Sequence, residues 1–568
     1  MKIITRIYNK NRMFVMMFVL VLGLSGILLQ GCIPRTNDAR SNIILIVADD
    51  LGYSEIGCYG GEIQTPNLDW LAGNGLRFTQ FYNAARCCPT RASLLTGLYP
   101  HQAGIGHMTE DKGYPAYSGE LSTGSKTIAE VLKESGYLTC MAGKWHVTQN
   151  TGPTDPDRNR PLDRGFDQFY GTLPGHGSYW DPAGLMKDNQ FIEPEGDFYY
   201  TEAISDYACL FIKDAVKKNK PFFLYVAYTA PHYPLHAREE VIRKYKETYA
   251  GGWDEVRDKR YRKLIDLGLI DPEWNLSHRD QMCYPWEQDT VKEWQANRMA
   301  VYAAMVDHMD QGIGRIIREL EAAGKLENSI ILFLSDNGGS AEGHLYNTVE
   351  RLGIPWKSSL IPESTKDGIK VKAGDWPGEP PGGPETYGSY GPGWANVSNT
   401  PFRLFKSWVH EGGISTPFII HWPAGIKVKN GIRHQVCHII DILPTILDIT
   451  GSTYPEIFNG SETSPLVGKS LVPFFNADTT DKRTLFWEHK GNKAIRKGKW
   501  KLVMEYTGEW NRKGALIGTW ELYNMETDRT ETKNLADQYP DLVQELEKEW
   551  NVWADKCGVI AWDRMKDY

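Results

Sequence analysis

The feature that most constrains the fold is a series of short apolar segments that alternate with helical patterns. The segments have the length and the β-branched or aromatic content of strands buried on both faces of a sheet. They are Asn42 to Val47 (NIILIV), Leu138 to Met141, Phe222 to Tyr228 (FFLYVAY), Ile330 to Leu334 (IILFL) and Pro417 to His421. Helical spacing covers Thr127 to Ser135, with Gly136 as its C-cap, and Arg298 to Ala323. This alternation predicts an α/β fold with a large, mostly parallel sheet flanked by helices.

Polar clusters follow the carboxyl ends of these predicted strands. In open α/β sheets, ligands bind at that edge. We therefore expect the clusters to converge in space although they are far apart in the chain. Their members are Asp49, Asp50, Lys144, His146, His232, Asp336 and Asn337.

The segment from Cys87 to Gly97 (CCPTRASLLTG) combines a reactive side chain with a helix start. Pro89 suits the first turn of a helix, and Arg91 lies one turn beyond Cys87. Cys87 would then sit among the exposed N–H groups at the positive end of the helix dipole, which attract an anion. By these arguments alone, two small buried residues before a helix remain an equally good interpretation.

This segment resembles the signature of the sulfatase family, in which Cys, any residue, Pro, Ser or Thr, and Arg precede Ala and a Leu-Thr-Gly stretch. The similarity extends from Asn42 to about Trp553 and is greatest to bacterial arylsulfatases. Further similar phrases are Gly143-Lys144-Trp145-His146, Arg164 to Asp167 (RGFD), Tyr302 to Asp307 (YAAMVD) and Lys406 to Gly413 (KSWVHEGG). The resemblance implies membership of the alkaline phosphatase superfamily. It also implies an alkaline-phosphatase-like sheet and a smaller C-terminal α+β domain on a short antiparallel sheet.

In that family the signature Cys, here Cys87, is oxidised to Cα-formylglycine (3-oxoalanine) by a separate maturation enzyme. One hydroxyl of the hydrated aldehyde attacks sulfur and releases the alcohol. The other then loses its proton and expels sulfate. The resemblance assigns one calcium ion to Asp49, Asp50, Asp336 and Asn337, together with an oxygen of residue 87. All of these ligands are oxygens, which calcium prefers.

The cationic residues take their roles from the same resemblance. Arg91 would hold the hydrate and the metal carboxylates, while Lys144 and Lys406 would bind sulfate oxygens. His146 would contact the formylglycine and take its proton. His232 would contact the sulfate ester and protonate the leaving oxygen. His176 and His410 are further candidates for the pocket, and the serine that often contacts the hydrate in this family has no clear counterpart here.

The N-terminus predicts export. A basic stretch precedes an apolar run from Met13 to Leu29, and the run ends in Leu29-Gln30-Gly31-Cys32, which resembles a bacterial lipobox apart from Gln30. We expect residues 1–31 to be a lipoprotein signal peptide, Cys32 to carry the lipid and 32–41 to form a tether. This places the protein in the periplasm or on the outer membrane of a bacterium. Simple secretion and a retained anchor remain alternatives.

The rest of the chain divides into a predicted catalytic domain over 42–455 and a C-terminal domain over 456–568. A Gly- and Pro-rich loop is inserted at about 349–394. Short strands are expected from Leu485 to Val503 and from Thr519 to Asn524, and a helix from Asp541 to Trp553. The nine cysteines fit neither a small disulfide scaffold nor a zinc pattern, and any disulfide pairing stays open.

The composition limits which classes of molecule the protein is expected to bind. The 568 residues carry a formal net charge of −8 and no long basic run, so a nucleic-acid partner is not expected. A sulfated small molecule or glycan is the expected substrate, and a membrane is expected only through the N-terminal lipid. Two other functions stay open: a phosphonate monoester hydrolase or phosphodiesterase of the same superfamily, and a catalytically silent surface lipoprotein that binds glycans.

Overall fold

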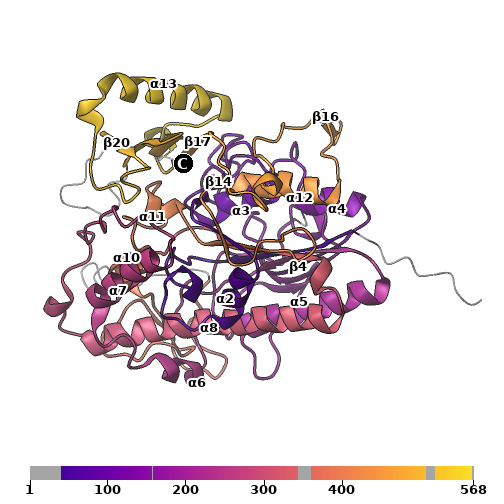
Figure 1. Cartoon of the computed structure of the whole chain (residues 1–568). Coiled ribbons are helices and arrows are strands. Elements are labelled where there is room, and N and C mark those ends of the chain that lie inside the picture. The colour runs from indigo at the N-terminus through magenta and orange to yellow at the C-terminus, as the bar shows by residue number, and fades with distance from the viewer. Residues whose placement is uncertain (1–39, 157, 343–359, 507–517, 566–568) are drawn as a thin grey trace, which may run out of the picture. The chain divides into compact units, whose positions relative to one another are not determined.

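The computed structural model describes residues 40–156, 158–342, 360–506 and 518–565. From Ser41 onward the described residues form one compact unit, drawn in Figure 1. Its centre is a ten-stranded mixed sheet in the order β13-β2-β12-β9-β1-β8-β4-β5-β6-β7. The strands are β1 (Asn42–Ala48), β2 (Leu76–Phe78), β4 (Leu138–Lys144), β5 (Gln168–Thr172), β6 (Leu185–Lys187), β7 (Gln190–Phe191), β8 (Phe222–Ala227), β9 (Ser329–Ser335), β12 (Phe418–His421) and β13 (Gly431–Arg433).

The middle of this sheet is parallel, as predicted. β1 pairs in parallel with β8 on one side and with β9 on the other. β4 continues the parallel order between β8 and β5. β12 runs antiparallel to both β9 and β2, which makes the sheet mixed. The carboxyl ends of β1, β8, β9 and β4 therefore lie along one edge.

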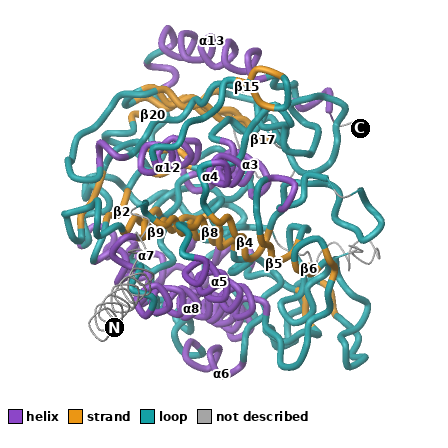
Figure 2. The backbone as a smooth tube through the Cα atoms, turned by 90° about the vertical axis from the view of Figure 1, so that its right-hand side faces the viewer, coloured by secondary structure: helices purple, strands orange, loops and turns teal. Residues whose placement is uncertain are grey.

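Helices cover both faces of the sheet, as Figure 2 shows. One layer contains α2 (Pro66–Gly73), α5 (Tyr200–Lys218) and α8 (Lys292–Ala322), and the other contains α3 (Cys87–Thr96), α4 (Ile128–Glu134) and α12 (Ile442–Thr450). Because side chains alternate along a strand, β1 serves both cores. Ile44 and Ile46 pack in the α5/α8 core, whereas Ile43 and Leu45 pack in the core with α3 and α12.

A four-stranded antiparallel sheet, in the order β17-β18-β19-β20, lies near the C-terminus. It consists of β17 (Thr484–His489), β18 (Asn492–Lys497), β19 (Trp500–Met504) and β20 (Trp520–Asn524), and α13 (Pro540–Cys557) packs against it. This arrangement confirms the predicted short antiparallel sheet and its helix. The apolar residues of this sheet belong to the same core cluster as Ile43 and Leu45 of β1. The domain boundary at 455/456 stays a prediction.

Further helices and three small sheets complete the described residues. The helices are α6 (Glu239–Ile242), α7 (Gly252–Asp266), α10 (Gly391–Ser398) and α11 (Glu411–Ile414). The two-stranded sheets pair β14 (Cys437–His438) with β3 (Phe81–Tyr82), β10 (Lys372–Ala373) with β11 (Thr386–Tyr387), and β15 (Ile457–Phe458) with β16 (Ser461–Glu462). Residues 349–359 of the predicted loop insertion lie outside the described residues, and 360–390 contain only β10 and β11 as regular elements.

The predicted elements differ from the observed ones mainly at their ends. The helix predicted from Arg298 begins at Lys292, and the strand predicted to stop at Met141 continues to Lys144. A Thr127 capping box starts α4, but the C-cap residue is Ser135, and Gly136 with φ +84° comes one position later. The predicted signal peptide and the predicted tether as far as residue 39 lie outside the described residues.

Two findings concern membranes and thiols. Across the described residues, no helix has both the length and the apolar character that are needed to cross a bilayer. All of the cysteines within the described ranges are free thiols. Cys32 lies outside those ranges.

Candidate active site

Four oxygen-bearing side chains meet where β1 and β9 end. Because the two strands are parallel neighbours with Ala48 opposite Ser335, the residues that follow them emerge together. Asp50 N–H donates to Asp336 Oδ1 at 3.3 Å, and Asn337 Nδ2 donates to Asp50 Oδ1 at 2.6 Å. Asp50 has φ +66°, a left-handed turn that lets its side chain bend back toward β9. The structure thus brings together the oxygen donors that the sequence singled out, and all of them are buried.

Cys87 is the first residue of α3, and its side chain is buried. Arg86 precedes the helix in an extended conformation, and the hydroxyl of Thr90 accepts a hydrogen bond from Ala84 N–H at 2.9 Å. This bond joins the first turn of α3 to the chain that enters it. Cys87 therefore has the helix-start position that the sequence predicted, among N–H groups that carry partial positive charge.

Arg91, one turn into α3, ties this helix to the strand ends. Its guanidinium donates to Asp336 Oδ2 through Nε at 3.0 Å and through Nη2 at 2.7 Å. Nη1 donates to the carbonyl oxygen of Lys144 at 3.1 Å, and Nη2 lies 3.8 Å from Asp49 Oδ2. Arg91 is fully buried, so these bonds hold α3, β4 and β9 in a fixed relation.

Two lysines lie against the carboxylates. Lys144 Nζ donates to Asp49 Oδ2 at 2.5 Å, and Lys406 Nζ donates to Asp50 Oδ2 at 2.9 Å. His232 Nε2 lies 3.2 Å from Lys406 Nζ and 3.5 Å from Asp50 Oδ2. Burial lowers the pKa of His232 to about 3, although Asp50 opposes the shift, so the ring is neutral near pH 7. Its Nδ1 lies 2.6 Å from the carbonyl oxygen of the following residue and therefore carries the proton.

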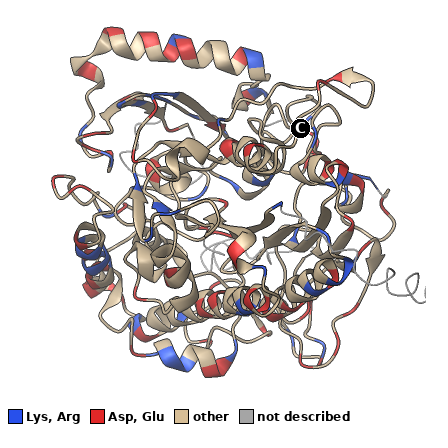
Figure 3. Ribbon diagram, turned by 45° about the vertical axis from the view of Figure 1, so that its right-hand side comes forward, with Lys and Arg blue, Asp and Glu red and all other residues tan. Residues whose placement is uncertain are grey.

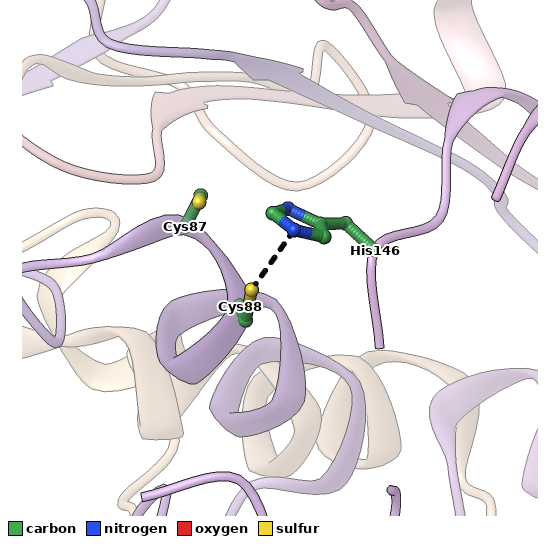
Figure 4. Close-up of side chains that lie close together, drawn as sticks. All are labelled: Cys87, Cys88 and His146. Carbon is green, nitrogen blue, oxygen red and sulfur yellow. Dashed lines mark hydrogen bonds between the residues drawn. The ribbon is translucent and has the colours of Figure 1, made fainter. Parts of the chain in front are cut away.

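His146 lies beside the second cysteine of the pair. Its Nε2 is 3.1 Å from Cys88 Sγ, as Figure 4 shows, and a ring nitrogen also lies within 4.8 Å of the sulfur of Cys87, the residue to which the sequence assigned its contact. Residue 146 has φ +54°, in the sharp turn that follows β4. Burial lowers the pKa of the ring to about 4, so this histidine is also neutral near pH 7.

The two adjacent thiols differ in acidity. A hydrogen bond from Cys88 lowers the pKa of Cys87 well below its usual value, and the charge of Lys144 and a hydrogen bond with His146 act in the same direction against burial. Burial raises the pKa of Cys88 well above its usual value. Cys87 is therefore the more readily ionised thiol of the pair.

Burial acts to raise the pKa of all three carboxyl groups, but the net pKa shifts differ in direction. Burial raises the pKa of Asp49, and it raises that of Asp336 well above the usual range. Burial also acts to raise the pKa of Asp50, but the Lys406 ammonium favours the ionised form, and the net shift is downward. A further positive charge in this cluster would stabilise the ionised form of each carboxyl group.

Glu342 is a neighbour of the site that sequence reasoning missed. Its carboxylate accepts a hydrogen bond from Arg86, accepts another from the Tyr233 hydroxyl at 3.3 Å and lies 3.4 Å from Lys406 Nζ. Arg86 and Lys406 outweigh the effect of burial and hold the pKa of Glu342 well below its usual value. The only sequence feature that could have identified Glu342 as a site residue is its position in the loop that follows Asp336.

The two additional histidines have different surroundings. The ring of His176 stacks on His232 with centroids 5.6 Å apart, and its Nδ1 lies 2.9 Å from the Tyr387 hydroxyl. It therefore lies next to the site. His410 is fully buried, with Nε2 3.4 Å from Glu521, and so faces the C-terminal sheet instead.

Comparison with known proteins identifies the family. The model of the Sulfatase family matches residues 41–452, and that of the N-sulphoglucosamine sulphohydrolase C-terminal region matches residues 402–555. An uncharacterised sulfatase of Schizosaccharomyces pombe is 36% identical, over 93% of this chain and 96% of its own length. The arylsulfatase of Klebsiella aerogenes is 34% identical, over 78% of this chain and 94% of its own length.

Solved structures agree with this result. Ps i-CgsB in complex with k-i-k-neocarrahexaose has a TM-score of 0.61 at 26% identity, covering 91% of this chain and 93% of its own. The PsFucS1 sulfatase from Pseudoalteromonas sp. shares the fold, with a TM-score of 0.59 at 21% identity over 91% of this chain and 90% of its own. With a family model that spans most of the chain and relatives matched over nearly their whole length, the chain belongs to the sulfatase family of the alkaline phosphatase superfamily and is a sulfuric ester hydrolase.

Proposed function

We propose that this sulfatase cleaves its substrate with a formylglycine made from Cys87 and a calcium ion held by Asp49, Asp50, Asp336 and Asn337. The observation that carries the proposal is the meeting of two parts of the chain. The buried thiol at the start of α3 and the oxygen donors after β1 and β9 are joined by Arg91, which bonds to Asp336.

The oxygen cluster suits a metal ion. Asp49 Oδ1 and Asn337 Oδ1 are buried, and neither has a hydrogen-bond partner among the described residues. Leaving a polar atom unpaired in the interior is costly, so each of these oxygens favours a ligand. A donor set made only of oxygens fits calcium or magnesium better than a softer ion. Bound calcium would offset the charge of the sulfate and lower the pKa of a coordinated hydroxyl.

The chain's own cations have defined tasks in this proposal. Arg91 holds the carboxylate of Asp336 toward the ion. Lys144 and Lys406, whose ammonium groups bond to Asp49 and Asp50, bind sulfate oxygens when the substrate is present. Both lysines are buried, so their attraction for an anion is weakly screened.

The two neutral histidines handle protons. Hydrated formylglycine supplies the oxygen nucleophile and a second hydroxyl. His146 lies beside the cysteine pair and accepts the proton of that second hydroxyl. His232 gives a proton to the leaving oxygen. The neutral ring carries its proton on Nδ1, so Nε2, which faces Lys406 Nζ, takes up a proton from solvent before it donates one.

The substrate we propose is a sulfated sugar or polysaccharide. One similar structure, Ps i-CgsB, was solved in complex with k-i-k-neocarrahexaose, which is consistent with this class of ligand. We also propose that the chain is exported to the periplasm or outer membrane and anchored by a lipid on Cys32, and that a separate maturation enzyme converts Cys87.

The direct test compares the wild type with Cys87→Ala on a chromogenic aryl sulfate. We expect the substitution to lower kcat by about 10⁴-fold or more, because it removes the nucleophile. The peptide spanning Ala84 to Arg91 of the active protein should weigh about 18 Da less than its cysteine form. Cys209→Ala, on α5 at the other face of the sheet, is the matched control and should keep its activity.

Two results would contradict the proposal. An unmodified thiol at residue 87 in fully active enzyme would rule out the aldehyde. Faster turnover of a phosphodiester or a phosphonate monoester than of the aryl sulfate would favour the related hydrolases.

A further inference from the structure

Residue 87 also belongs to a second group of ligand atoms, with different chemistry from the carboxylates. The sulfur atoms of Cys87 and Cys88 and a ring nitrogen of His146 all lie within 4.8 Å of one another, and all three residues are buried (Figure 4). Two thiols and an imidazole prefer zinc or a softer ion to calcium. We propose that the chain with unmodified Cys87 binds one zinc ion through Cys87, Cys88 and His146.

The separation of these atoms suits a tetrahedral ion. Zn–S bonds of about 2.3 Å and Zn–N bonds of about 2.0 Å place neighbouring ligand atoms about 3.5 to 3.8 Å apart. Cys88 Sγ and His146 Nε2 are 3.1 Å apart, so a small outward rotation of either side chain makes room. Three protein ligands leave the fourth position for water.

The surroundings of the His146 ring are compatible with binding zinc. Its ring lies against the backbone of Gly175, where a Cβ atom would be 2.3 Å from Cε1 and 2.4 Å from Nε2. A side chain at position 175 would press on the ring, so this glycine leaves room for His146 beside Cys88. His146 Nδ1 has no hydrogen-bond partner in the described part of the chain, so it is available to carry the proton of a metal-binding neutral imidazole.

Charge balance also favours the ion. On binding zinc, each thiol releases its proton to solvent and becomes a thiolate, so Zn²⁺ and two thiolates together are neutral. A neutral group is less costly in this buried cluster than an isolated ion would be. The Lys144 ammonium remains paired with Asp49 and does not need to move.

The site exists only before maturation, a consequence that rests on the proposed function. Conversion of Cys87 to formylglycine removes one of the two sulfur ligands. Residue 87 would then no longer be a zinc ligand. Its oxygen would instead join the proposed calcium ligands Asp49, Asp50, Asp336 and Asn337. Zinc on the precursor would also cover the thiol that the maturation enzyme must oxidise.

The test uses the full chain made in a host without a maturation enzyme, with the unmodified thiol verified by peptide mass. Titration with cobalt(II) should give a near-ultraviolet thiolate-to-cobalt band that reaches its maximum at one equivalent and is removed by zinc. Cys88→Ser should abolish the band and weaken zinc binding by about 100-fold or more. Cys209→Ser should leave both unchanged, and His146→Gln provides a second variant that removes a ligand.

Further variants separate this site from the oxygen cluster. Asn337→Ala should keep the cobalt band. If instead Asn337→Ala removes the band while Cys88→Ser keeps it, the ion binds the carboxylates and the zinc proposal is wrong. A matured enzyme that cleaves aryl sulfate, together with an unmodified chain that gives no band, would leave the proposed function intact and reject the zinc site. A cobalt band from the unmodified chain, together with active enzyme that keeps its thiol, would support the zinc site and reject the proposed function.

Discussion

At the scale of single residues, the site depends on buried groups whose charges are balanced within a few ångströms. Arg91 bonds to Asp336, and Lys406 bonds to Asp50. Asn337 is different, because its amide nitrogen donates to Asp50 while its oxygen has no partner among the described residues. That oxygen is the clearest candidate for an ion ligand, because an amide cannot ionise or change its charge to relieve burial.

We predict that Asn337→Ala removes the stabilisation that calcium provides. A ligand at 100 times its dissociation constant stabilises the folded state by about 2.7 kcal/mol, so calcium should raise the Tm of the wild type measurably. The variant should show little or no shift in a thermal scan with and without calcium. Asn396→Ala, which truncates another buried asparagine with an unpaired oxygen, should keep the wild-type shift. An equal shift in Asn337→Ala would show that residue 337 is not a ligand.

At the scale of elements, a buried ion network joins the C-terminal sheet to α11 and β3. Glu411 begins α11, and its carboxylate bonds to Lys501 of β19 at 2.9 Å and to Arg529 at 2.9 Å. The hydroxyl of Tyr82 in β3 donates to it at 2.8 Å. Burial acts to raise the pKa of Glu411, but Lys501 and Arg529 outweigh it and lower the pKa to about 2.

We predict that Glu411→Gln destabilises the protein by about 3 to 5 kcal/mol, because it removes a counter-charge from the buried cations Arg529 and Lys501, of which Lys501 keeps its pair with Glu531. The folded-state pKa lies below the unfolded value. The carboxylate therefore contributes its full stability above about pH 4.5 and loses it as the pH falls toward 2. Denaturant unfolding at several pH values should show a steeper acid loss in the wild type than in the variant. Glu255→Gln, which breaks an exposed pair with Lys259, should cost less than about 1 kcal/mol.

At the scale of the whole molecule, the ten-stranded sheet and the C-terminal sheet both contribute to the hydrophobic core that contains α3 and α12. Leu485 and Ile495 of the C-terminal sheet belong to the same buried cluster as Ile43 of β1 and Leu443 of α12. Charges of both signs occur along the ribbon in Figure 3, including α13. The unit from Ser41 onward therefore coheres mainly through apolar burial together with the ion network described above.

We predict that a chain ending at residue 455 does not fold cooperatively, because truncation exposes the apolar surface that the C-terminal sheet covers. It should be insoluble or show no sharp thermal transition, whereas removal of residues 1–40 should leave the Tm unchanged. A soluble, cooperative 41–455 chain would show that the predicted domain boundary separates independent folding units.

The sequence alone was enough for the α/β class, because buried parallel strands such as those at 42–47 and 330–334 are continuous apolar runs. Strands of only two or three residues, such as β2 and β13, have no such pattern and are formed by pairing with their neighbours. The sequence also singled out Cys87, Arg91 and the oxygen donors, since each follows a strand end or lies in the signature.

Only the tertiary structure decided which side chains touch. The contact of His146 with Cys88 and the bonds of Glu342 to Arg86 depend on turns that bring distant segments together. No local spacing encodes such contacts, because they arise where strand ends from different parts of the chain share one edge of the sheet. Residue types thus predicted the chemistry of the site, while the register of β1 against β9 determined its geometry.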